Sequence, residues 1–314
     1  MSHPRCPHCR LGKTIKHGSQ RWLCKSCQRT FSSQRKDVRD RAAIHGYVLD
    51  RSTYKRLGER WKVDRSTAYR RVKRALEKRE TLLDRTWRNL NQCDGVLVLD
   101  GKWISIGGEL HTCFVAWDRG FKKPVHFLLR KGGEKELWYW RLLLDLERLG
   151  YVPKAFVSDG VLSFKELVSD RYPNLPHQRC TVHVFLAARG KVAHGRKANE
   201  RTDTFVELLR RILWSRTLRE ARRRFEKVWN TKPLKRNERV ALELVWSALP
   251  DCFVCRDSRF KHLHLPRSSN AIENVIGQAE ARLKTRRGNK SIRAAEVLLN
   301  DLFLRVEEQT ITHN

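Results

Sequence analysis

Two aspartates end short apolar runs, a pattern typical of carboxylates that hold metal ions. Asp100 closes the run Val96–Asp100, and Asp159 closes the run Lys154–Asp159. If these runs are neighbouring strands, the two carboxylates face one another, which is unfavourable without a cation between them. Two Mg²⁺ ions about 4 Å apart relieve that repulsion and can catalyse in-line displacement at phosphorus. Hard cations such as Mg²⁺ or Mn²⁺ prefer oxygen ligands, which accounts for Asp at both positions.

A third carboxylate is expected from a later helix, and we favour Glu273 as this ligand. The apolar residues around it repeat at helical spacing, and serines before it can cap the helix. Asn270 and Gly277 share a neighbouring face with Glu273. We therefore expect Asn270 to support the active site, while Gly277 leaves room for a ligand. Glu280 and Glu243 remain the alternatives for the third ligand.

Two C-x-x-C pairs near the start of the chain predict a zinc site. Cys6 and Cys9 form the first pair, and Cys24 and Cys27 form the second. Two such pairs at this separation can close a tetrahedral thiolate site around one Zn²⁺. The residues between them suit a hairpin, so we expect a zinc ribbon that depends on the metal for stability. A redox dithiol is the alternative, and surrounding basic residues favour DNA binding over protein docking.

Cys180 and His183 form a C-x-x-H motif after a predicted strand. One turn of helix places the two side chains close together. We interpret them as buried, hydrogen-bonded residues that shape the active site. The alternative is a second metal site, which Cys252 and Cys255 would complete.

The segment that follows the cysteine pairs predicts a helix, a turn and a second helix. Asp64 is a good N-cap for the second helix, and Ala68 and Val72 fall on its buried face. A basic helix pair that reads no sequence is the alternative to a DNA-reading helix-turn-helix. On the opposite face, six side chains can reach base edges and phosphates in a major groove: Arg65, Ser66, Thr67, Tyr69, Arg70 and Lys73.

The residues between the two aspartates predict the elements that position them. Strands at 96–100, 110–117 and 123–129 precede an amphipathic helix at 134–149 and a fourth strand at 154–159. This is the opening order of the RNase H-like fold, an α/β fold in which the first and fourth strands are neighbours. Asp118-Arg-Gly120 predicts a turn, so we interpret Asp118 as a turn residue.

Four motifs resemble those of the DDE transposases of bacterial Mutator-like insertion sequences, in the same order. The resemblance covers about residues 93–305. It implies that Asp100, Asp159 and Glu273 are the metal ligands and that residues 187–265 form a helical insertion. It also implies binding of terminal inverted repeats, DNA cleavage and strand transfer. The motifs are Leu99-Asp100-Gly-Lys-Trp103, Ser158-Asp-Gly160, Gln178-Arg-Cys-Thr-Val-His183 and Ser269-Asn-Ala-Ile-Glu-Asn274.

The chemistry of these segments divides the chain into three predicted domains. Residues 1–35 form the zinc ribbon and residues 36–92 the helix-turn-helix domain. Residues 93–314 form the catalytic domain with its helical insertion. A zinc ribbon and a helix-turn-helix ahead of the catalytic domain resemble one branch of the same group.

The charge of the chain points to a polyanionic partner. Among 314 residues there are 66 Lys and Arg against 34 Asp and Glu, a net charge of +32. Nucleic-acid phosphates can neutralise such an excess, and a membrane surface is the alternative. The sequence has no run of about 18 apolar residues and no signal peptide. We therefore expect a cytoplasmic, nucleoid-associated protein that binds double-stranded DNA as a homodimer or higher homo-oligomer.

Two other classes of protein share part of this pattern. A non-catalytic DNA-binding regulator has the same two N-terminal modules but no need of three carboxylates. A structure-directed nuclease of the same fold does not need two separate DNA-binding modules. Inverted repeats around the gene, bounded by short direct duplications, would favour the transposase.

Overall fold

A computed structural model of the chain describes residues 6, 9, 13–17, 21–32, 40, 42–50, 52–160, 162–193, 200–231, 233–284 and 291–305. The chain divides into two compact units, residues 1–79 and residues 80–314. Among the described residues, no helix is both long enough and apolar enough to cross a bilayer.

The first unit begins with a small antiparallel sheet around the cysteine pairs. Its strands are β1 (Thr14–Lys16), β2 (Arg21–Cys24) and β3 (Thr30–Ser32), in that spatial order. The hairpin expected between the two cysteine pairs is present as β1 and β2. The third strand, which pairs Trp22 with Phe31, was not expected.

The helical part of the first unit follows. It contains a short helical turn, η1 (His45–Leu49), and the helices α2 (Tyr54–Trp61) and α3 (Arg65–Glu77). Asp64 caps α3 as predicted, because its carboxylate accepts from the Thr67 amide at 2.9 Å. Leu57 of α2 and Ala68 and Val72 of α3 are buried, so the predicted apolar faces pack in this unit.

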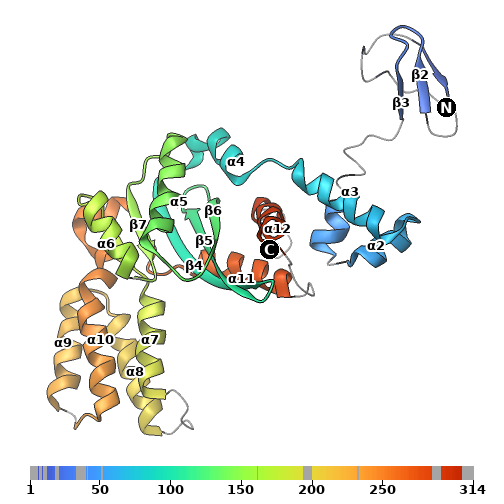
Figure 1. Cartoon of the computed structure of the whole chain (residues 1–314). Coiled ribbons are helices and arrows are strands. Elements are labelled where there is room, and N and C mark those ends of the chain that lie inside the picture. The colour runs from blue at the N-terminus through green and yellow to red at the C-terminus, as the bar shows by residue number, and fades with distance from the viewer. Residues whose placement is uncertain are drawn as a thin grey trace. The chain divides into compact units, whose positions relative to one another are not determined.

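The second unit is built on a five-stranded mixed sheet (Figure 1). Its strands are β4 (Val96–Ile106), β5 (Glu109–Asp118), β6 (Lys123–Lys131), β7 (Ala155–Ser158) and β8 (His177–Arg179). The spatial order is β6-β5-β4-β7-β8. The first three strands form an antiparallel meander, and β7 runs parallel to both β4 and β8. The predicted pairing of the first strand with the fourth is therefore observed.

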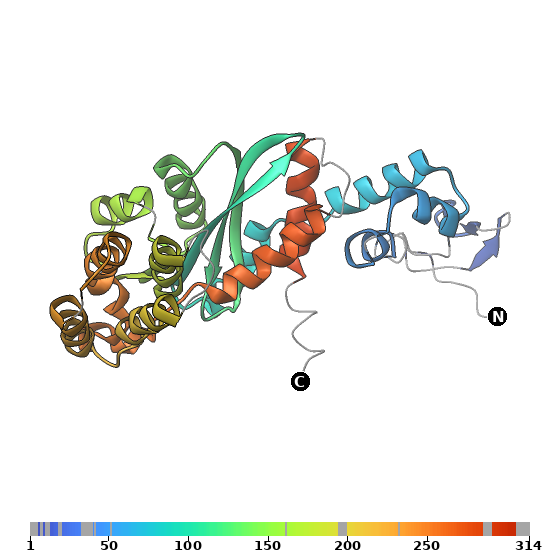
Figure 2. The same cartoon turned by 90° about the horizontal axis from the view of Figure 1, so that it is seen from below.

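Helices cover both faces of this sheet. On one face, α5 (Glu136–Arg148) and α6 (Leu162–Arg171) pack on an apolar core that includes Leu97 and Leu99. On the other, α11 (Asn270–Lys284) contacts β4 and β5, and α12 (Ile292–Leu304) contacts β6. Figure 2 shows α11 and α12 crossing the sheet on the side away from α5.

The boundary between the units differs from the predicted one at residue 92. The helix α4 (Leu82–Arg88) belongs with the sheet, because the Thr86 hydroxyl donates to the Val125 carbonyl at 2.7 Å. Arg85, which is buried, donates to the carbonyls of Pro124 and Leu304. A 3-10 turn, η2 (Leu90–Gln92), then leads into β4. The division at residue 79 therefore follows from contacts made far away in the sequence.

A separate group of helices is inserted between β8 and α11. It comprises α7 (Thr181–Ala193), α8 (Glu200–Leu213), α9 (Leu218–Thr231) and α10 (Arg236–Cys252). These helices share an apolar core of their own. Two 3-10 turns, η3 (Val254–Arg256) and η4 (Ser258–Leu263), lead on towards α11. The helical segment begins at residue 181, earlier than the predicted 187, because α7 is part of the bundle.

Candidate functional site

The sheet brings Asp100 and Asp159 to the same level. Val98 of β4 is paired with Val157 of β7 in a parallel ladder, and each aspartate lies two residues beyond its strand's paired valine. Asp100 is only 7% exposed. Its pKa is raised to about 7, mainly by burial; the carboxylates of Asp159 and Glu273 contribute to the rise, and His183 opposes it. Asp159 and Glu273 therefore both lie near enough to the Asp100 carboxyl group to perturb its pKa, although the three are not among the groups of described residues whose ligand atoms all lie within 4.8 Å of one another.

The choice between Glu273 and its two alternatives depends on how α11 lies against the sheet. Glu273, in the first turn of α11, is one of the groups that perturb the pKa of Asp100. Glu280 lies further along the helix, with its carboxylate 3.9 Å from the Lys102 ammonium. Glu243 is exposed on α10 in the helical bundle. These placements favour Glu273.

A compact polar network holds the Glu273 carboxylate. The buried Ser269 hydroxyl lies 3.1 Å from Glu273 Oε1 and 3.4 Å from both Cys180 Sγ and His183 Nδ1. His183 Nδ1 is 3.7 Å from Glu273 Oε1. The hydrogen bond to Cys180 raises the pKa of His183 to about 9, although burial opposes this. Burial alone would raise the pKa of Cys180, but its hydrogen bonds with His183 and Ser269 lower it. The network therefore places a cationic imidazolium beside Glu273.

One donor atom each from Cys180, His183 and Glu273 lies within 4.8 Å of the other two, as in a metal-binding cluster. Cys252 and Cys255 do not join it within the described residues. Cys252 is buried in the bundle, and burial raises its pKa to about 12. The Cys255 amide donates to the side chain of Gln178, which ties η3 to β8. The alternative of a four-ligand site built from these cysteines therefore has no geometric support.

The carboxylates fit a hard divalent cation better than the sulfur-containing cluster does. Asp100, Asp159 and Glu273 offer oxygen atoms only, which Mg²⁺ and Mn²⁺ prefer, whereas a thiolate favours softer metals. In the described part of the chain, no Lys or Arg lies within ion-pair distance of Asp100. A divalent cation would remove the like-charge repulsion that raises the pKa of Asp100.

The structure adds residues that the sequence interpretation missed. Glu134 lies beside Gly101, next to Asp100, and its pKa is raised by burial and by Asp159 although Tyr139 donates to it. In the sequence, only the two glycines that follow the strand and precede Glu134 could have indicated that this residue lies near the site. Ser269 was interpreted as a helix cap, and its contacts with Cys180 and Glu273 had no signal.

Other predicted residues have simpler surroundings. Asp118 is fully buried and accepts hydrogen bonds from the amides of Gly95 and Phe121 and from the Tyr151 hydroxyl, so it holds the turn as predicted. Asn270, predicted as a support residue, is exposed at the first position of α11.

The four N-terminal cysteines form a second candidate metal site. Their sulfur atoms all lie within 4.8 Å of one another, with Cys6 and Cys27 at 3.6 Å and Cys9 and Cys24 at 3.6 Å. A tetrahedral Zn²⁺ site with bonds of about 2.3 Å would separate its sulfurs by about 3.8 Å. The Cys27 amide lowers the pKa of Cys24 to about 6, which favours the thiolate that metals bind.

The exposed face of α3 carries the six predicted DNA-contacting residues. Arg65, Tyr69, Arg70 and Lys73 are exposed. Ser66 and Thr67 instead give their hydroxyl groups to the Asp64 carboxylate. The two hydroxyl groups therefore stabilise the helix start, whereas the four larger side chains remain open to a partner.

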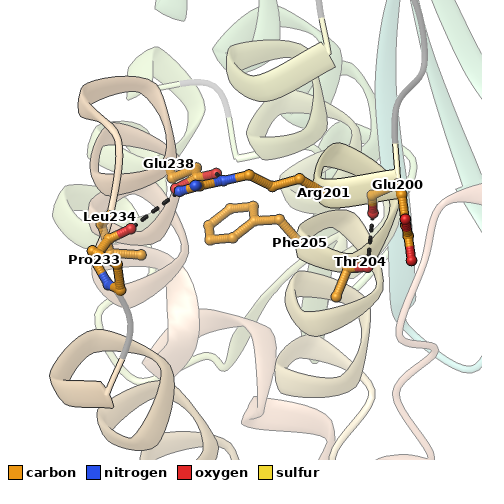
Figure 3. A pocket seen from close by; sticks show the side chains of 7 residues that line it. All are labelled: Glu200, Arg201, Thr204, Phe205, Pro233, Leu234 and Glu238. Carbon is orange, nitrogen blue, oxygen red and sulfur yellow. Dashed lines mark hydrogen bonds and ion pairs between the residues drawn. The ribbon is translucent and has the colours of Figure 1, made fainter.

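A pocket of about 490 Å³ lies elsewhere, between the starts of α8 and α10 (Figure 3). Phe205 forms one wall, and the guanidinium of Arg201 bridges the Glu238 carboxylate and the Pro233 carbonyl, each at 3.1 Å. These charged groups already satisfy one another, and none of the predicted site residues lines the pocket. We interpret it as a hollow of the helical bundle.

Comparison with known proteins gives a partial sequence relative and several remote structural likenesses, of which two are described. The relative is an uncharacterized protein in transposable element ISH50 of Halobacterium salinarum, 34% identical over 84 residues. The match covers 23% of this chain and 29% of that protein, so the chain spans less than a third of its relative's length. A Drosophila P element transposase strand transfer complex matches 91% of this chain and 83% of its own, with 13% identity and a TM-score of 0.38. A pre-cleavage Mos1 transpososome matches 70% of this chain and 80% of its own, with 13% identity and a TM-score of 0.22.

Neither structural overlap is close enough to define the fold of this chain. The family comparison is more informative. Residues 79–308 match the family described as "Transposase, Mutator family". The match begins at the junction between the two compact units and includes the sheet, the carboxylates and the inserted helices. Because it extends over well more than half of the sequence, the chain belongs to the Mutator family of transposases.

Proposed function

We propose that the second unit is an RNase H-like catalytic domain that cleaves DNA at the ends of a mobile element and transfers the freed strand to target DNA. The observation that carries this proposal is the buried Asp100 carboxyl group, with Asp159 and Glu273 near enough to raise its pKa. The strand order β6-β5-β4-β7-β8, with a meander followed by parallel strands, is the arrangement expected of that fold. Membership of a transposase family supports DNA as the substrate.

Each residue of the cluster has a separate task in this proposal. Asp100, Asp159 and Glu273 hold Mg²⁺ or Mn²⁺ through their oxygens. When bound, the cations activate the attacking hydroxyl and stabilise the leaving oxygen during displacement at phosphorus. Ser269, Cys180 and His183 orient the Glu273 carboxylate, with the His183 cation offsetting part of the negative charge.

The first unit would hold the DNA. We propose that Cys6, Cys9, Cys24 and Cys27 bind one Zn²⁺ as a zinc ribbon, and that α2 and α3 act as a helix-turn-helix. The exposed residues of α3 would enter the major groove of the terminal inverted repeats. A homodimer or higher homo-oligomer would bring the two ends of an element together.

End cleavage on a labelled duplex that carries the ends of the element tests the catalytic proposal. Asp100→Asn, Asp159→Asn and Glu273→Gln should each lower the cleavage rate in Mg²⁺ or Mn²⁺ by about a hundredfold or more, because each removes a charged ligand. DNA binding should persist, since the proposed binding residues lie in the first unit.

Glu280→Gln is the matched control, because it makes the same change on the same helix. It should retain most of the activity. If Glu280→Gln is inactive while Glu273→Gln cleaves normally, the third ligand is assigned to the wrong residue. If all three variants cleave at the wild-type rate, the metal assignment is wrong. If the wild-type protein binds these ends without cleaving them, it is a regulator.

A further inference from the structure

Glu134 lies next to the proposed metal site, although it is on neither of the strands that carry the aspartates. It follows β6 and two glycines and lies two residues before the first residue of α5. Its carboxylate lies across Gly101, the residue after Asp100 on β4. A Cβ atom at Gly101 would be 2.8 Å from Glu134 Cδ and 2.9 Å from Oε1, closer than such atoms approach in proteins. The absence of a side chain at residue 101 therefore makes room for this carboxylate.

The Glu134 side chain is oriented by a rigid donor. The Tyr139 hydroxyl donates to Oε2 at 2.8 Å. Tyr139 is 1% exposed and packs against the rings of Phe114 and Phe164, so its hydroxyl has little freedom to move. Within the described residues, no donor to Oε1 is found, and Oε1 is the oxygen nearest to Gly101 in the fixed side chain.

The charge around Glu134 is negative. Burial raises the pKa of this carboxyl, and the neighbouring Asp159 raises it further. Asp159 and Asp100 also raise the pKa of Tyr139, so the charges of both aspartates are felt at the hydroxyl that donates to Glu134. Across the described ranges, no Lys or Arg lies within ion-pair distance of Glu134, although the chain has 66 such residues. Among the described residues, His183 has the opposite effect and lowers the pKa of Glu134.

The buried Asp100 gives an independent indication that this arrangement holds a ligand. The side chain is 7% exposed, yet in the described part of the chain only the Gly101 amide donates to it, at 2.9 Å to Oδ1. A buried carboxylate without a strong partner is costly. A divalent cation held by Asp100 together with neighbouring carboxylates would supply that partner.

We propose that Glu134 is a fourth carboxylate of the divalent-cation site and that Gly101 admits it. This inference rests on the proposed function, since it extends the same site. Asp100, Asp159, Glu273 and Glu134 together supply the negative charge that holds the cations. Tyr139 acts as a positioning residue by fixing the Glu134 carboxylate.

Mn²⁺ binding to the zinc-loaded full chain without DNA tests this inference. The binding is measured by calorimetry and by the electron paramagnetic resonance signal of free Mn²⁺. Glu134→Gln should weaken Mn²⁺ binding about tenfold or more, the lower end of the effect of changing a group that supports a metal site. Glu136→Gln is the matched control: Glu136 is exposed at the start of α5, and its replacement should leave Mn²⁺ affinity unchanged.

Gly101→Ala provides a second variant that leaves the charge unchanged. Gly101 does not have a positive φ, so alanine fits the backbone, but its methyl group would displace the Glu134 carboxylate. This variant should weaken Mn²⁺ binding as Glu134→Gln does. Combining the two changes should weaken it little further, because both remove the same ligand. Circular dichroism and thermal melting of the metal-free proteins check that each variant is folded.

Asp100→Asn separates failure of this inference from failure of the proposed function. If Asp100→Asn abolishes Mn²⁺ binding while folded Glu134→Gln and Gly101→Ala bind like the wild type, Glu134 is not a ligand and only this inference is wrong. If Asp100→Asn also binds Mn²⁺ normally, the metal site and the proposed function are both wrong.

Discussion

Asp100 in the second unit and Cys24 in the first are each almost inaccessible to solvent and adjacent to groups of the same kind. Their pKa values are perturbed in opposite directions. Burial raises the pKa of Asp100 to about 7, whereas the Cys27 amide lowers that of Cys24 to about 6. Clusters of this kind are stable when a cation neutralises them. The two clusters differ in donor atom, so oxygen and sulfur predict different metals.

Zinc content tests the cysteine cluster. The wild-type protein should bind one Zn²⁺ in the first unit, and Cys24→Ser with Cys27→Ser should lose it, because two thiolates do not close a tetrahedral site. The metal content is measured by mass spectrometry of the purified proteins, with DNA affinity followed in parallel. Cys93→Ser, outside both clusters, is the control and should keep its zinc. Full zinc occupancy in the double variant would show that the metal is held elsewhere.

Among the elements, the sheet and α5 are linked by a buried histidine–aspartate contact as well as by apolar contacts. His126 of β6 is 6% exposed, and its Nε2 lies 3.5 Å from Asp145 Oδ2 of α5, too long for a strong hydrogen bond. Burial lowers the pKa of His126 to about 4. Asp145 opposes this shift, while Arg130 and Arg141 add to it. The packing of α5 positions Tyr139, so the pair stabilises the helix that also contacts the candidate site.

The perturbed pKa of His126 predicts acid sensitivity. An unfolded histidine has a pKa near 6.5, so between pH 6.5 and about 4 the unfolded state binds more protons than the folded state. Stability is complete above this window and falls as the pH is lowered through it, by up to about 3 kcal/mol. His126→Gln removes this contribution. Denaturant unfolding at several pH values should show the difference between variant and wild type changing across the window. A constant difference would contradict the assignment.

The whole molecule combines a strongly positive charge with a small cluster of acids. The net charge is +32 over 314 residues, yet the second unit collects carboxylates around Asp100. A basic protein attracts DNA phosphates by releasing their counterions. The carboxylates repel those phosphates unless divalent cations are bound. The family match begins at residue 79, so the first unit lies almost wholly outside it, and the role of that unit depends on its own residues.

Salt dependence tests the role of the first unit. The logarithm of the affinity for terminal-repeat DNA should fall steeply with the logarithm of salt concentration. Arg70→Ala or Lys73→Ala should reduce that slope by about 0.9 each, because each removes one phosphate contact. Arg71→Ala is the matched control: it is exposed on the same helix but lies outside the predicted face. An equal loss in Arg71→Ala would show that another face of α3 contacts the DNA.

Much of the architecture follows from local sequence patterns. The alternation of apolar runs after residue 95 predicts the meander, the helix and the fourth strand, because side-chain periodicity is set by the backbone geometry of each element. The cap at Asp64 and the cysteine pairs are equally local, since a cap or a two-cysteine knuckle spans only a few residues. The carboxylates of Asp100 and Asp159 could be paired because they occupy equivalent positions on neighbouring parallel strands, although β4 continues to Ile106 instead of ending at Asp100 as predicted.

Other features depend on contacts between distant residues, and only the tertiary structure decided them. Whether Glu273 or Glu280 approaches Asp100 depends on how α11 crosses β4, which helical periodicity does not contain. Glu134 reaches the site because Gly101 lacks a side chain and Tyr139 is fixed by packing. The boundary between the two units at residue 79 also depends on contacts between distant residues, those that join α4 to the sheet. The sequence by itself determined which elements form and which donor atoms they carry. The packing of those elements decided which donor atoms come close together, because short-range interactions do not specify the distances between elements.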